Sequence, residues 1–203
     1  MSEKIDLLKD KKDLYHPSAK PAIIDVPVMQ FLMIDGQGAP GSQLYQEVVS
    51  SLYQMSYSLK FAIKKQLEID YGVMPLEGLW WALDWNAFTA DQRDQWQWTM
   101  MIAQPEWVTA ERVEEARRQV IKKGSQRAEQ IRFESFHEGL CAQVMHTGPY
   151  SAEAPVIAAL HAFITAQGYR LEGKQHEIYL GDPNRTAPER LKTVLRQPVA
   201  AKL

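Results

Sequence analysis

The chain has 203 residues, a net charge of -2, a pI of about 6.2 and one cysteine. A lone cysteine excludes an intramolecular disulfide, and the balanced charge disfavours binding to nucleic acid phosphates. The amino terminus is charged and no apolar stretch is long enough to span a bilayer, so we expect a cytoplasmic protein that is neither secreted nor membrane-inserted.

The first half of the chain predicts an arm, then a strand, a helix and two strands. Residues 1–20 are rich in Lys and Asp and are expected to form a loosely held arm. The apolar run 26–34 predicts a strand, and Ser42 is placed to cap a helix that reaches about Gln66. Residues 74–84 and 95–105 predict two further strands.

The second half repeats this order. After a charged linking helix at 109–124, capped by Thr109, come a strand ending at His146, a helix ending at Gly168 and a hairpin formed by residues 175–180 and 190–199. We therefore predict an α+β fold in one domain over 21–203. It consists of tandem β-α-β-β repeats, about 26–105 and 130–199, related by a pseudo-twofold axis around a central ligand cleft.

The middle strand of each predicted repeat carries a glutamate that could face this cleft. Strand alternation places Glu177 and Tyr179 on one face, and Glu77 and Trp81 on one face of the equivalent strand. A carboxylate among aromatic side chains attracts cations or, with a raised pKa, acts as a general base. The alternative is a solvated glutamate on an edge strand.

Tryptophans are concentrated in a short region of the first half. Five of the six lie there: Trp80, Trp81, Trp85, Trp96 and Trp98. They predict either an aromatic-rich core or walls on which a flat ligand stacks.

Three segments carry a resemblance to a known family: MHTGPYSAEAPVIAALHAF at 145–163, HEIYLGDP at 176–183 and PLEGLWW at 75–81. With them, nearly the whole chain from Val26 resembles the GyrI-like small-molecule-binding domains, which also form the drug-sensing half of some MerR-type and AraC-type regulators. The resemblance implies a cleft that binds flat, often cationic molecules beside Glu177, where cation–π attraction assists. No helix-turn-helix segment precedes Val26, so we expect a stand-alone ligand domain that does not bind DNA.

The EGLWW segment is similar to members of this family that hydrolyse cyclopropane-bearing alkylating antibiotics. This implies a xenobiotic-detoxifying hydrolase in which Glu177 activates water and Tyr179 stabilises an oxyanion, with neither a metal nor an organic cofactor. The ligand-binding residues implied are Glu77, Trp81, Trp98 and Tyr150, with Trp80 in place of Trp81 if a bulge shifts the strand. Glu77 is alternatively the second acid/base.

Two other functions remain open beside hydrolysis. The first is a non-catalytic protein that binds or sequesters many drug-like molecules. The second is a partner protein that modulates DNA gyrase, and the charged helix is the only sign of this function in the sequence. Self-association into a homodimer is left open. We expect a drug-like small molecule as ligand, and neither nucleic acid nor membrane as partner.

Overall fold

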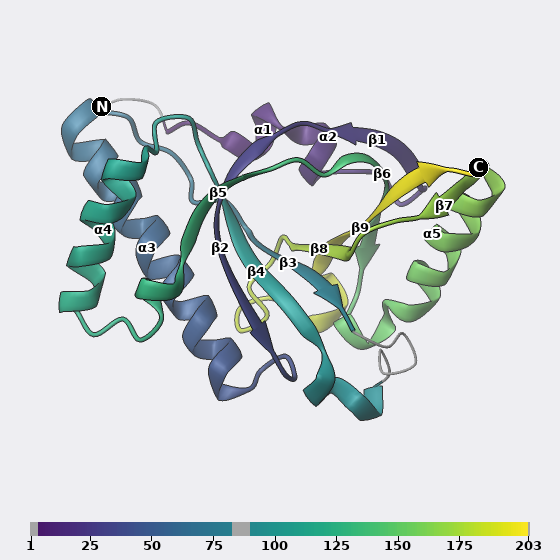
Figure 1. The fold of residues 1–203 in the computed structure, drawn as a ribbon. Coiled ribbons are helices and arrows are strands. Elements are labelled where there is room, and N and C mark those ends of the chain that lie inside the picture. The colour runs from purple at the N-terminus through teal and green to yellow at the C-terminus, as the bar shows by residue number, and fades with distance from the viewer. Residues whose placement is uncertain (1–3, 83–89, 203) are drawn as a thin grey trace. The chain divides into compact units, whose positions relative to one another are not determined.

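The computed structural model describes residues 4–82 and 90–202 and confirms the mixed α+β class, with antiparallel strands and few helices (Figure 1). The chain divides into two compact units. Unit 1 contains the described residues within 1–10, 29–76 and 81–136, and unit 2 contains those within 11–28, 77–80 and 137–203. Within the described ranges, no helix is both long and apolar enough to cross a bilayer.

Unit 1 is organised around the central strand β2 (Met29–Gln37), which pairs antiparallel with β4 (Gln97–Gln104) and with β5 (Arg132–Phe136). The helices α3 (Gln43–Leu67) and α4 (Ala110–Lys122) lie next to each other in this unit (Figure 1). The short elements of unit 1 are α1 (Leu7–Asp10), η2 (Ala90–Gln95) and η3 (Ala128–Gln130).

Both long helices of unit 1 begin where the sequence predicts. The Ser42 side chain accepts a hydrogen bond from the Tyr45 amide at the start of α3, and Thr109 accepts one from the Arg112 amide at the start of α4. One face of α3 is buried at helical spacing, by Val48, Leu52, Met55, Leu59 and Ile63. The predicted caps and the apolar face are thus confirmed.

Unit 2 contains an antiparallel sheet in the order β1-β6-β9-β8, with β8 next to the part of β3 that belongs to this unit. The short strand β7 pairs with the end of β9. The strands are β1 (Ala22–Val26), β3 (Leu76–Trp81), β6 (Gly139–Thr147), β7 (Tyr169–Leu171), β8 (Gln175–Tyr179) and β9 (Lys192–Ala201). The helices are α2 (Lys12–Tyr15), η4 (Tyr150–Ala152), α5 (Ala154–Ala166) and η5 (Pro188–Arg190).

Helix α5 covers one face of the sheet in unit 2. Its Leu160 and Ile164 join Val144 of β6 and Leu195 of β9 in a buried core. The predicted hairpin is confirmed, because β8 and β9 pair antiparallel with Glu177 opposite Leu195.

The chain order strand-helix-strand-strand is present twice, as β2-α3-β3-β4 and as β6-α5-β8-β9 with β7 inserted. However, β1 precedes β2 in the chain and pairs with β6, whereas β5 precedes β6 and pairs with β2. Each unit therefore takes strands from both halves of the sequence. The repeat boundaries, the pseudo-twofold axis and the central cleft stay predictions.

The predicted loose arm is wrong for residues 12–15. They form α2, in which Leu14 and Tyr15 are buried. The segment is bonded to other parts of unit 2. The Gln143 side chain donates a hydrogen bond to the Asp13 carbonyl, and the Arg196 side chain donates one to the Leu14 carbonyl. The sequence shows only two apolar residues in a charged stretch, whereas the partners that hold the segment, Glu77, Gln143 and Arg196, lie 62 to 182 residues away.

Candidate functional site

The two faces of β8 carry different chemistry. Glu177 is paired with Leu195 and Tyr179 with Thr193 of β9, so both lie on the face that α5 covers. His176 alternates with them and lies on the opposite face. The predicted alternation of Glu177 and Tyr179 is confirmed.

A chain of hydrogen bonds holds the Glu177 carboxylate. The Trp80 indole N–H donates to the Tyr179 hydroxyl at 2.9 Å, and that hydroxyl donates to Oε2 of Glu177 at 2.9 Å. The Gln175 amide donates to Oε1 at 2.8 Å. Both oxygens of a part-buried carboxylate thus accept a hydrogen bond, which favours the ionised form.

Tyr150 completes the aromatic surroundings of this carboxylate. Its ring meets the ring of Tyr179 edge-on, with 5.6 Å between centroids and 77° between planes. Tyr150 itself is exposed. The structure therefore brings together four of the predicted site residues: Trp80, Tyr150, Glu177 and Tyr179.

A second carboxylate near Glu177 was missed by the sequence analysis. Glu153 lies at the N-terminal end of α5 and is 5% exposed. Its burial, and next the charge of Glu177, raise the pKa of Glu153 to about 8. Burial likewise raises the pKa of Glu177, although hydrogen bonds from Tyr179 and Gln175 and the charge of His176 act against it. A glutamate at a helix start is ordinarily solvated and favoured by the helix dipole, so the sequence carried no sign of this burial.

The opposite face of the sheet contains a buried charge network around His176. The Nε2 of His176 lies 2.9 Å from Oε2 of Glu77, and its Nδ1 lies 3.0 Å from Glu138. Glu138 also accepts from Arg196 at 3.1 Å, and Oε1 of Glu77 accepts from the Tyr15 hydroxyl at 2.7 Å.

The pKa values in this network follow from burial opposed by charge. Burial alone would lower the pKa of His176, but the charge and hydrogen bond of Glu138 and those of Glu77 raise it to about 9. Burial alone would raise the pKa of Glu138, but His176 and Arg196 lower it. His176 is therefore a buried cation between two carboxylates.

Glu77 does not face the same side as Glu177. The sequence predicts both carboxylates in a common groove, but Glu77 is 1% exposed and bonded to His176 on the opposite face. Trp80 and Glu77 both belong to β3, and it is Trp80 whose side chain lies beside Tyr179 of β8. Both oxygens of Glu77 are bonded within the protein, so the function proposed below does not use it.

The remaining predicted tryptophans belong to unit 1 or lie outside the described residues. Trp98 is fully buried over Gly36, and its indole N–H donates to the Gly38 carbonyl at 3.1 Å. Trp81 ends β3 and is half-buried. Trp85 lies outside the described residues. The stacking roles of Trp81 and Trp98 stay predictions.

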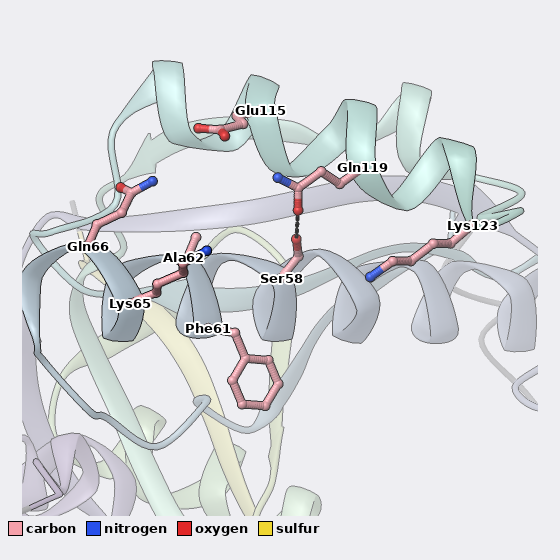
Figure 2. A pocket seen from close by; sticks show the side chains of 8 residues that line it. All are labelled: Ser58, Phe61, Ala62, Lys65, Gln66, Glu115, Gln119 and Lys123. Atoms are coloured by element: carbon pink, nitrogen blue, oxygen red, sulfur yellow. Dashed lines mark hydrogen bonds between the residues drawn. The ribbon is translucent and has the colours of Figure 1, made fainter.

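The helices of unit 1 border a hollow of about 320 Å³ (Figure 2). Its lining comes from α3 and from α4 with the Lys123 that follows it, and the Ser58 hydroxyl lies 3.4 Å from Oε1 of Gln119. Phe61 and Lys65 also line it. None of the predicted site residues lines this hollow. Across 4–82 and 90–202, no three His, Cys, Asp or Glu side chains are grouped to hold a metal ion.

Comparisons with known proteins agree with this fold. The family model of the GyrI-like small molecule binding domain matches residues 19–200. An uncharacterized conserved protein from Listeria innocua is 41% identical, with a TM-score of 0.91, over 97% of this chain and 100% of that chain. No curated protein matches significantly.

Two further structures, each described as a hydrolase from Listeria innocua, are also similar. They are 39% and 40% identical, with TM-scores of 0.85 and 0.87, over 97% and 98% of this chain and 100% of each of theirs. Since the family model spans most of the sequence, and relatives 39% to 41% identical share the fold over their whole lengths, the chain belongs to the GyrI-like small-molecule binding domain family.

Proposed function

We propose that the chain binds flat, apolar or cationic molecules beside Glu177 and hydrolyses those that carry a strained cyclopropane ring. The observation that carries this proposal is the part-buried Glu177 carboxylate, oriented at both oxygens by Tyr179 and Gln175. The hydrolase descriptions of two relatives about 40% identical support hydrolysis in general. Detoxification of alkylating xenobiotics, and hence antibiotic resistance, would follow from such a substrate.

The proposed reaction adds one water to a cyclopropane fused to a dienone. The water oxygen bonds to a ring carbon while Glu177 takes a water proton. The ring carbon–carbon bond breaks, and its electron pair moves into the dienone, whose oxygen becomes a phenolate. Tyr179 gives its proton to that oxygen and receives one from Glu177, to which its hydroxyl is hydrogen-bonded.

Replacement of Glu177 tests this reaction directly. The Glu177→Gln variant keeps the shape and the hydrogen bond from Tyr179 but cannot take a proton, so we expect turnover to fall about 100-fold or more. The protein is incubated with many equivalents of a cyclopropane-bearing alkylator in ¹⁸O-labelled water, and the labelled ring-opened adduct is followed by mass spectrometry. Glu172→Gln, which changes an exposed carboxylate of the same unit, is the matched control.

Binding is measured in parallel through tryptophan fluorescence, because Trp80 contacts Tyr179. We expect Glu177→Gln to retain binding. Equal turnover in Glu177→Gln and in the wild type would refute the role of Glu177. Stoichiometric binding without product in the wild type would refute catalysis and leave a sequestering protein.

A further inference from the structure

The direction of the hydrogen bonds between Trp80, Tyr179 and Glu177 follows from the chemistry of the three groups. The indole N–H of Trp80 only donates, so the Tyr179 hydroxyl oxygen, 2.9 Å away, is its acceptor. An ionised carboxylate only accepts, so the same hydroxyl donates its single hydrogen to Oε2 of Glu177, also at 2.9 Å. In the resting site the bonds therefore run in one direction, from Trp80 through Tyr179 to Glu177.

Trp80 enters these bonds as a buried donor. The residue is 4% exposed, so it presents little surface to a ligand. A buried indole N–H without an acceptor would cost free energy, and the Tyr179 hydroxyl supplies that acceptor. The bond therefore fixes where the Tyr179 oxygen lies relative to Glu177.

We propose that Trp80 is a positioning residue that fixes the Tyr179 hydroxyl, so that Tyr179 becomes available as the acid only after Glu177 has acted as the base. This inference rests on the reaction proposed above. While Glu177 is ionised, it holds the hydrogen of Tyr179. Once Glu177 has taken a proton from the attacking water, it becomes a donor itself, and the Tyr179 hydrogen is released to the oxygen that becomes a phenolate.

The protons balance in this sequence. Tyr179 gives its hydrogen to the phenolate oxygen, and the neutral carboxyl group of Glu177 gives the proton taken from water to Tyr179. Glu177 ends as a carboxylate and Tyr179 as a neutral hydroxyl, as both began. During the exchange, negative charge passes over the Tyr179 oxygen, where the N–H of Trp80 stabilises it.

The first test removes the N–H of Trp80 and keeps the shape of the ring. Trp80→benzothienylalanine carries sulfur in the place of the indole nitrogen and donates no hydrogen bond. We expect kcat for the cyclopropane-bearing alkylator to fall about tenfold and KM to stay within about twofold, because the lost donor acts on proton transfer and not on ligand binding. The same replacement at Trp107, which packs against Tyr71 in unit 1, should leave both constants unchanged.

Two kinetic results would overturn the proposal. The first is an unchanged kcat and an unchanged KM. The second is a raised KM with kcat unchanged, because Trp80 would then contact the ligand instead of acting through Tyr179.

The second test needs no substrate and separates this inference from the proposed function. The indole N–H resonance of Trp80, identified by its loss in Trp80→Phe, is followed by ¹H–¹⁵N NMR. A hydroxyl that donates to a carboxylate is a better acceptor than one that donates to a neutral amide, so Glu177→Gln should move this resonance upfield. In a Tyr179→Phe background, Glu177→Gln should leave it unmoved, because the hydroxyl that links the two side chains is gone.

A resonance that Glu177→Gln leaves unmoved, or moves equally with and without the Tyr179 hydroxyl, would overturn the inference whatever the outcome with the alkylator. The expected resonance shifts with no turnover in the wild type would refute the proposed function and leave Trp80 as the residue that fixes Tyr179.

Discussion

Glu177 and His176 are consecutive in the chain, yet they sit in different chemical surroundings. Glu177 lies on the α5 face with hydrogen-bond donors from Tyr179 and Gln175, whereas His176 is buried on the other face between Glu77 and Glu138. One face therefore carries the part-buried carboxylate to which we assign the proposed function, and the other carries a buried cluster of charges that links Glu77, Glu138 and Arg196. A substitution of Glu177 should therefore affect mainly function, and a substitution of His176 mainly stability.

At the residue scale, loss of His176 should destabilise the fold. His176→Ala leaves the buried carboxylates of Glu77 and Glu138 without their shared cation, so we expect the free energy of unfolding to fall by about 3 to 5 kcal/mol. The pKa of His176 is raised to about 9 in the folded state. Its contribution is therefore fully present below about pH 6.5 and is lost as the pH rises through about 9.

Urea unfolding at pH 6, 7.5 and 9 measures both effects. The exposed His137→Ala variant should unfold like the wild type at each pH. Wild-type stability that rises between pH 6.5 and 9 would contradict the assignment of His176 as a buried cation.

At the element scale, the close packing of β2 against β4 depends on a single glycine. Gly36 is paired with Trp98, and a Cβ built at Gly36 would lie 2.1 Å from the indole ring. The Tyr45 ring of α3 packs edge-on against the same indole at 5.6 Å. The helix and both strands thus meet at one tryptophan, which has no room to move aside.

Gly36→Ala should therefore lower the free energy of unfolding by about 1 to 3 kcal/mol, the cost typical of overpacking a core. Chemical denaturation followed by tryptophan fluorescence measures this change. Gly72→Ala is the control, because a Cβ there would meet only Lys4 at an ordinary 3.8 Å. Equal losses at the two glycines would show that backbone freedom, rather than contact with Trp98, sets the cost.

At the scale of the whole molecule, each unit is assembled from distant parts of the chain. Residues 11–28 and 77–80 belong to unit 2 together with the C-terminal region from residue 137. The Tyr15 hydroxyl bonds to Glu77, 62 residues away, and Arg196 bonds to the Leu14 carbonyl, 182 residues away. Unit 2 is therefore complete only when segments from both ends of the sequence have met.

Tyr15→Ala should consequently weaken unit 2 more than unit 1. It removes a buried ring and the hydroxyl bonded to Glu77, and we expect a loss of about 3 kcal/mol. Hydrogen exchange of backbone amides should show lost protection in β6, β8 and β9 and retained protection in β2 and β4. Tyr57→Ala, at an exposed aromatic residue of unit 1, should leave unit 2 protected. Uniform loss across both units in Tyr15→Ala would contradict the division into separately stabilised units.

The local features of the fold and part of the site were predictable from the sequence. The caps at Ser42 and Thr109, the apolar face of α3 and the β8–β9 hairpin follow from residues close together in the chain. Glu153, in contrast, reads as an ordinary solvated residue at a helix start, and nothing in its neighbouring residues indicates that it is buried.

The sequence by itself determined the α+β class, the starts of α3 and α4 and the alternation that puts Glu177 beside Tyr179, since each depends on interactions within a few residues. Only the tertiary structure decided that β1 and β5 pair across the two halves, that Glu77 joins His176 and that Glu153 is buried. The physical reason is the register between strands far apart in the chain: a shift of one residue turns a side chain to the other face, and no local pattern specifies that shift.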